Sequence, residues 1–251
     1  MNPKFSVTAS VGKEFYQQGE EIVITGKVSG VDVANAKLEV YIISNGAREV
    51  LQAQADSDGN YTLNFKPASR QMGHFMVGAC YPGEGLKTEM ASFDIYGIRR
   101  TSDSWITWNV TTDEPYTDKI AIFNPCNVPL TNVKAELVSL VNGCQVEFDV
   151  LSSIPANSMG EIAYTVTGNE QTNLIDYERM PLKITTAEGA SLSTTVFYHC
   201  KSQKPVLRAN VSSIHTTVTK GTVRDYSVIL TNTGKEETGV VSVVLPSDQK
   251  W

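Results

Sequence analysis

The chain has 251 residues, of which 41% are hydrophobic and 19% are charged, and its formal net charge is −6 at pH 7. This composition is typical of globular domains rather than of disorder. The acidic balance argues against a nucleic-acid-binding surface, which needs clustered Lys and Arg to neutralise phosphates. No apolar run reaches the length of about eighteen residues that a membrane-spanning helix needs, so we expect no membrane span.

The first part of the chain, residues 1–98, alternates short apolar segments with turn residues and shows no sustained helical period. Asn45-Gly46 lies between two such segments and suits a tight hairpin turn with positive φ. Short strands separated by regular turns predict an antiparallel β-sandwich. The predicted strands span residues 5–11, 21–28, 36–43, 49–55, 61–65, 73–81 and 91–96.

The polar stretch 97–103 predicts a short linker to a second sandwich over residues 104–200. A third part, residues 204–251, has the strand pattern of an opening half-sandwich. The second part again predicts strands, at 105–110, 119–123, 132–141, 144–150, 160–166, 179–186 and 191–199. In the third part they fall at 207–212, 216–219, 225–231 and 240–245.

One stretch occurs twice, as an apolar strand, an Asn-led turn and a second alternating strand. Asn124 corresponds to Asn232 at an offset of 108 residues, and Val133 then corresponds to Val241. A repeat of roughly the length of an immunoglobulin-like domain, about 100 residues, indicates tandem domains. The predicted fold class is therefore all-β, with tandem immunoglobulin-like antiparallel β-sandwiches.

Half a sandwich cannot bury its own core, so we expect the chain to be a fragment of a longer protein. The N-terminal residues lack the basic region and apolar core of a secretory signal. A cytosolic protein and a piece of an exported protein both fit this start. We favour the exported protein, with its leader lying upstream.

Two parts of the sequence resemble known families. The segments 19–28 and 36–41, with Asp58-Gly59-Asn60-Tyr61, resemble the Ig-like modules of bacterial surface proteins and macroglobulin-like domains. The segment 154–160, which leads into a predicted strand, and the turns that begin at Asn124 and Asn232 resemble those of bacterial cell-adhesion-related (CARDB) domains. These resemblances imply a bacterial multi-domain surface protein.

The four cysteines have no spacing typical of a zinc site. If consecutive strands run antiparallel, Cys144 and Cys200 lie at the same end of the second sandwich and are the candidate disulfide. That bond would close a loop of about 55 residues and contribute about 3–4 kcal/mol. Buried free thiols remain the alternative, and we interpret Cys80 and Cys126 as packed apolar residues.

A weak calcium candidate consists of Asp56, Asp58 and Asn60, which place alternate side-chain oxygens around Gly59. The motif lacks the distal Glu of an EF-hand loop. An ordinary turn, in which Asp and Asn bind their own backbone, is the favoured interpretation. We otherwise predict no metal and no cofactor.

Trp105 and Trp108 are three residues apart, so a strand would point them to opposite faces. One is expected in the core. The other would cover a domain junction or form an aromatic surface on which a sugar stacks.

No catalytic motif is recognised, and His74, His199 and His215 are scattered over the three parts. We therefore predict no enzyme activity. The favoured function is spacing and presentation in a secreted or surface-anchored protein, with adhesion to a protein or glycan ligand and contacts to neighbouring domains. The alternative is a set of accessory sandwiches, including carbohydrate-binding ones, beside the catalytic domain of a secreted glycoside hydrolase or peptidase.

Overall fold

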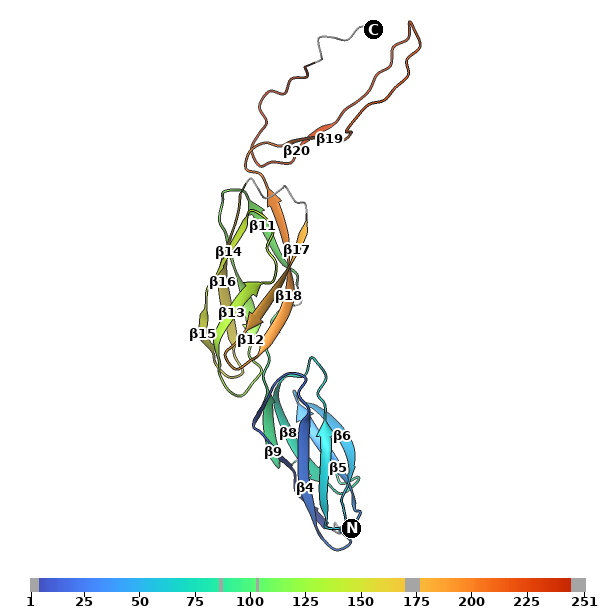
Figure 1. Ribbon diagram of the computed structural model, residues 1–251, viewed down its shortest axis with the longest axis vertical. Helices are drawn as coiled ribbons and strands as arrows, with labels where there is room; N and C mark the ends of the chain where they lie inside the picture. Colours follow the sequence, from blue (N-terminus) through green and yellow to red (C-terminus); the bar gives the residue numbers. More distant parts are fainter. Residues whose placement is uncertain (1–4, 86–87, 103, 170–176, 245–251) are drawn as a thin grey trace.

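The computed structural model describes residues 5–85, 88–102, 104–169 and 177–244. Two β-sandwiches and an open hairpin follow one another along the long axis of the molecule (Figure 1). Every regular element in these residues is a strand, and no helix among them is long and apolar enough to cross a bilayer. The fold is all-β, as the alternation of apolar residues predicts.

The first sandwich packs a four-stranded sheet against a five-stranded sheet. The first sheet has the order β1-β4-β2, with β7 also paired to β4. Its strands are β1 (Phe5–Val7), β2 (Ser10–Val11), β4 (Ile22–Gly30) and β7 (Asn60–Phe65). The second sheet has the order β3-β9-β8-β5-β6. Its strands are β3 (Phe15–Tyr16), β5 (Lys37–Ser44), β6 (Ala47–Gln54), β8 (Gly73–Cys80) and β9 (Ala91–Ile95).

Burial in the first sandwich follows the two-residue alternation of its strands. In β4, Ile22 and Ile24 are fully buried, whereas the side chain of Val23 between them is exposed. The hairpin that joins β5 and β6 turns at Asn45 and Gly46, whose φ angles are 50° and 78°. Positive φ at both positions is what the Asn-Gly pair predicts.

The second sandwich again packs a four-stranded sheet against a five-stranded sheet. The first has the order β10-β12-β16-β14, and the second β11-β18-β17-β13-β15. The first sheet consists of β10 (Arg99–Arg100), β12 (Tyr116–Phe123), β14 (Cys144–Phe148) and β16 (Met159–Gly168). The second consists of β11 (Ile106–Thr111), β13 (Leu130–Leu137), β15 (Leu151–Ile154), β17 (Glu178–Thr185) and β18 (Ser191–Lys201). Two facing sheets in this strand order form an immunoglobulin-like sandwich.

Among the described residues, the strands of each sandwich pair antiparallel except for one parallel pair, and the second sandwich also has an isolated parallel bridge between Thr112 and Gly168. β3 runs parallel to β9, and β11 runs parallel to β18. β14 and β15 together form one continuous edge segment, because the chain leaves the sheet of β16 after β14 and joins β13 two residues later. This segment closes one side of the second sandwich.

The structure corrects one expectation in the second sandwich and decides which of its two tryptophans lies in the core. The stretch expected as a linker contains β10, which pairs with β12 and so belongs to the sandwich. Trp108 is fully buried, with its ring 5.2 Å from that of Tyr164, so it cannot contribute to an aromatic surface. Trp105 is 74% exposed, as the opposite faces of a strand require.

The third part forms a hairpin of β19 (Leu207–Ala209) and β20 (Leu230–Asn232). Its remaining described residues form no further strand, in contrast to the strand expected at 216–219 and the described part of the one expected at 240–245. Of the strand expected at 225–231, only residues 230 and 231 lie in β20. No described sheet covers this part, and Val223 and Val240 are 90% and 99% exposed. Residues 245–251 of the expected third part lie outside the described residues.

Candidate functional site

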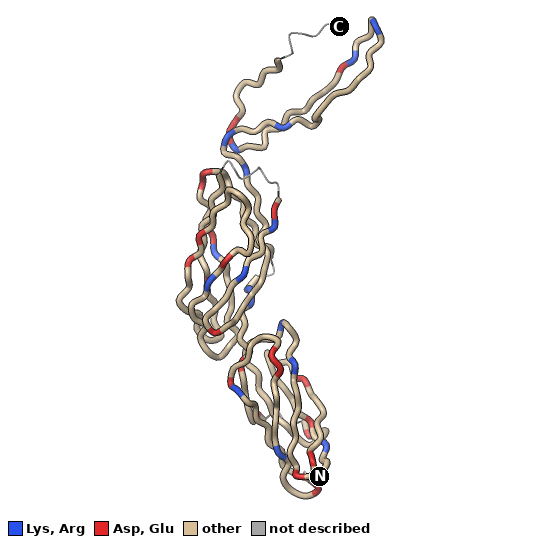
Figure 2. Tube along the Cα trace, viewed as in Figure 1, with Lys and Arg blue, Asp and Glu red and all other residues tan. Residues whose placement is uncertain are grey.

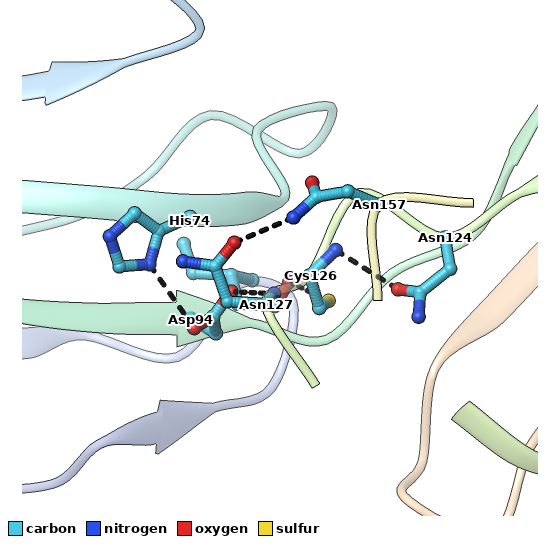
Figure 3. Close-up of polar contacts among 7 residues, drawn as sticks. His74, Asp94, Asn124, Cys126, Asn127 and Asn157 are labelled. Carbon is cyan, nitrogen blue, oxygen red and sulfur yellow. Dashed lines mark hydrogen bonds and ion pairs between the residues drawn. The ribbon is translucent and has the colours of Figure 1, made fainter. Parts of the chain in front are cut away.

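The contact between the two sandwiches is centred on one buried carboxylate. Asp94, on β9, is 5% exposed, and one of its oxygens lies 3.3 Å from Nδ1 of His74 on β8 (Figure 3). Its other oxygen accepts a 2.9 Å hydrogen bond from the backbone N–H of Asn127, in the second sandwich. A carboxylate is a stronger acceptor than a neutral group, and here it connects the two sandwiches directly.

A buried thiol makes a second contact across the interface between the two sandwiches, which we call the joint. Sγ of Cys126 donates to the backbone oxygen of Ile95, the last residue of β9, at 3.4 Å. Burial raises the pKa of the Cys126 thiol to about 11, so it is protonated at neutral pH and able to donate. Cys126 is packed as the sequence predicts, but its hydrogen bond to the other sandwich was not expected.

The side chain of Asn124 stabilises the turn that contains Cys126 and Asn127. Its Oδ1 accepts from the backbone N–H of Cys126 at 2.9 Å, and its Nδ2 lies 2.8 Å from the carbonyl oxygen of Val128. The same Nδ2 reaches the carbonyl oxygens of Ile154 and Pro155 at 3.2 and 3.0 Å. Asn124 is fully buried, so these bonds satisfy an amide that water does not reach.

The two sandwiches also fit closely at the backbone. A Cβ atom on Gly73, where φ is 92°, would lie 2.5 Å from the carbonyl oxygen of Pro125. On another side of the joint, Nε2 of Gln17 donates to the backbone oxygen of Glu188 at 2.9 Å. Burial opposes ionisation of Glu188, but hydrogen bonds from Thr131 outweigh it and lower the pKa of this carboxyl group. Hydrogen bonds at several points of the joint therefore hold the two sandwiches together.

The same turn recurs 108 residues later and again contacts the preceding part of the chain. Oδ1 of Asn232 accepts from the backbone N–H of Gly234 at 3.0 Å, and its Nδ2 donates to the carbonyl oxygen of Glu236 at 2.7 Å. The backbone N–H of Lys235 donates to the carbonyl oxygen of Ser202 at 2.9 Å. Lys235 and Ser202 are the residues that the repeat aligns with Asn127 and Asp94. The repeat seen in the sequence is thus also a repeat of the joint.

A second candidate site is an aromatic face on the outer side of the second sandwich. We define the aromatic face by the residues that line a shallow hollow of about 320 Å³: Trp105, Thr107, Tyr177, Arg179, Phe197 and His199. The Trp105 ring stands edge-on to that of Phe197 at 4.8 Å, and the Tyr177 ring lies 5.3 Å from Phe197. The Arg179 guanidinium lies 5.6 Å from both the Tyr177 and Phe197 rings.

The register of the strands assembles this face. Phe197 on β18 pairs with Thr107 on β11 and with Arg179 on β17, so the three side chains form one row. Nε of Arg179 donates to the hydroxyl of Tyr177 at 2.9 Å, which fixes the guanidinium against the rings. Only Trp105 of this group is predicted from the sequence, because the other members are brought together by pairing between distant segments.

The other site residues predicted from the sequence include the cysteine pair Cys144 and Cys200. All four cysteines are free thiols, and Cys144 and Cys200 both lie beside Tyr198, whose pKa is raised by burial and further by the two thiols. Their predicted disulfide is not formed here and stays a prediction.

The calcium candidate forms a turn. Oδ1 of Asp56 accepts from the backbone N–H groups of Asp58 and Asn60 at 2.9 and 2.8 Å. Hydrogen bonds from the backbone of Asn60, which outweigh the effect of burial, lower the pKa of Asp56. These contacts account for the motif, and calcium binding by these three residues stays a prediction.

No protein-family model matches the chain, and no curated protein matches it. Among solved structures, a protein of unknown function from Porphyromonas gingivalis W83 is 14% identical, with 78% of this chain and 99% of that chain covered and a TM-score of 0.30. An I-band fragment of titin is 13% identical, with 82% of this chain and 73% of that chain covered and a TM-score of 0.33. The fold assignment rests on the strand order described above.

Proposed function

We propose that this chain is a non-catalytic spacing and presentation segment of a larger bacterial surface or secreted protein. In this role, tandem sandwiches hold another module at a defined distance and orientation. The observation that carries the proposal is the recurrence of the joint, with the Asp94–Asn127 contact aligned to the Ser202–Lys235 contact. A joint that recurs with the same hydrogen-bonded turn, and whose first copy is built on buried Asp94 and Asn124, favours a stiff array over independently tumbling domains.

The proposal extends the resemblance to Ig-like and cell-adhesion-related modules, and it places the protein outside the cell or at its surface. The runner-up is a set of accessory sandwiches next to the catalytic domain of a secreted glycoside hydrolase or peptidase. The neighbouring domains encoded in the same gene distinguish the two. Further sandwiches support the spacer, and an adjoining catalytic domain supports the accessory role.

Replacing Asp94 with alanine is expected to loosen the joint, because the backbone N–H of Asn127 loses its charged acceptor and His74 loses its partner. Loss of a hydrogen bond to a charged group costs about 1.5–3 kcal/mol, enough to populate bent arrangements of the two sandwiches. Small-angle X-ray scattering would then show a broader distribution of molecular dimensions.

Asp149→Ala is the matched control, because it removes an equal charge from an exposed position on the second sandwich. It should leave the scattering profile unchanged. If Asp94→Ala scatters like the parent protein at every concentration, the joint does not set the stiffness and the spacer proposal loses its support.

A second candidate function, adhesion to a glycan or protein ligand, is favoured by the aromatic face. Trp105 and Tyr177 are 74% and 44% exposed, although aromatic rings of this size are usually buried. Rigid aromatic side chains beside an arginine are typical of binding surfaces.

The Trp105→Ala, Tyr177→Ala double variant is expected to weaken binding at least about tenfold in a screen of glycans, matrix proteins and cells. Its thermal stability should stay close to that of the parent, since both side chains are exposed. Tyr226→Ala removes a comparably exposed aromatic ring, 48% exposed, in the third part and serves as the control. A parent protein that retains no ligand in the screen would exclude adhesion through this face.

A further inference from the structure

A cleft of about 760 Å³ lies between the two sandwiches, beside the joint. One wall comes from the β5–β6 turn and the loop before β8, and the other from β10 and the start of β18. Figure 2 shows basic positions on both sides of the gap between the sandwiches. The lining residues are Ser44, Asn45, Ala47, Arg70, Gln71, Met72, Ile98, Arg99, Arg100, Ser102, Leu192, Ser193 and Thr194.

The charge of this cleft is opposite to that of the whole chain. Its lining holds three arginines, Arg70, Arg99 and Arg100, and no aspartate or glutamate. The chain as a whole has 27 acidic against 21 basic residues. Three positive charges without a lining carboxylate favour an anion in the cleft.

Two of the three arginines are held in place before any ligand binds. The Arg99 guanidinium lies 4.6 Å from the centre of the Phe123 ring, and Arg100 donates to the backbone oxygen of Ser104. Arg70 has no partner among the residues that the structure describes, and no described carboxylate pairs with any of the three. Side chains that are already ordered lose less entropy when they bind a ligand.

We propose that this cleft binds an anionic polysaccharide, with carboxylate or sulfate groups held by the three arginines. Arginine presents a planar fork of donors that matches both groups. The hydroxyl and amide groups of Ser44, Asn45, Gln71, Ser102, Ser193 and Thr194 supply hydrogen bonds for sugar hydroxyls. Because the two walls belong to different sandwiches, a bound chain would contact both.

The residues that line the cleft also favour a polysaccharide over a nucleic acid as its ligand. Single-stranded nucleic acids bind through aromatic side chains on which the bases stack. No Phe, Tyr or Trp lines the cleft. The aromatic face, in contrast, lies on the outer side of β11, β17 and β18 and is a different site.

The test is titration of the full chain with three oligosaccharides: sulfated heparin fragments, carboxylated polygalacturonate fragments and neutral dextran. We expect binding of one or both anionic chains, no binding of dextran, and weaker binding as salt rises. The triple variant Arg70→Gln, Arg99→Gln, Arg100→Gln should bind at least about tenfold more weakly. Heparin carries both sulfate and carboxylate groups, so binding of polygalacturonate shows that carboxylates suffice, and binding of heparin alone shows that sulfates are needed.

Two control proteins make the result specific. Lys27→Gln, Lys37→Gln, Lys134→Gln removes the same charge from exposed positions outside the cleft and should bind like the parent. Ser193→Glu keeps every arginine but adds a carboxylate to the lining, and it should weaken binding at least about threefold. Equal loss in the lysine control, equal binding of a DNA oligonucleotide, or no binding of either anionic chain would each overturn the proposal.

Discussion

Replacing Trp108 with alanine is expected to lower the free energy of unfolding of the second sandwich by about 3–5 kcal/mol. The indole is fully buried and packs against the rings of Tyr164 at 5.2 Å and Phe148 at 6.3 Å. Alanine would leave a cavity between the two sheets that neighbouring strands cannot fill. Urea unfolding followed by far-ultraviolet circular dichroism measures the change without relying on tryptophan fluorescence.

The matched control is Trp105→Ala, the same substitution three residues earlier on the other face of the chain. Trp105 is 74% exposed, so its loss should cost less than about 1 kcal/mol. Comparable losses at the two positions would contradict the assignment of Trp108 to the core and Trp105 to the surface.

Asn124→Ala is expected to cost about 3 kcal/mol and also to weaken the joint. The substitution leaves the N–H of Cys126 without its acceptor and the carbonyls of Val128, Ile154 and Pro155 without their shared donor. Each buried polar group without a partner costs about 1–3 kcal/mol, and relaxation of the turn recovers part of the sum. Chemical unfolding measures the stability, and X-ray scattering measures the joint.

Asn232→Ala tests the same turn in an exposed setting. Asn232 makes equivalent bonds to Gly234 and Glu236, but water replaces them there, so the expected loss is below about 1 kcal/mol. A small effect at Asn124 would mean that the turn is held by its flanking strands rather than by this side chain.

Local patterns in the sequence predict most of the strands and the turns between them. The two-residue alternation of β4 and the Asn45-Gly46 turn both match the structure, because burial on one face and positive φ are properties of adjacent residues. β3 and β10 were missed because each has two residues, too few for alternation to be recognised. β15 and the sheet change before it were also missed, because the alternation of Cys144, Val146 and Phe148 breaks at Leu151 and the two central residues of β15 are serines.

The candidate sites depend on contacts that adjacent residues do not reveal. Asp94 and Asn127 are 33 positions apart, and Gln17 and Glu188 are 171 apart, so only the packing of whole sandwiches brings them together. The 108-residue repeat was the one long-range signal in the sequence. It predicted that Asn124 and Asn232 are equivalent, although not that both hold a turn that contacts the preceding part of the chain.

The parallel pairing of β11 with β18 determines how the second sandwich would respond to a pulling force. The chain enters this sheet at β11 and leaves the sandwich at β18, and the two strands pair over six residue pairs, from Ile106–Val196 to Thr111–Lys201. Tension applied along the array would pull these strands lengthwise past each other, so their hydrogen bonds would bear the load together rather than opening one at a time. The parallel pair in the first sandwich, β3 with β9, has two residue pairs. Under load, the second sandwich would therefore be the more resistant link.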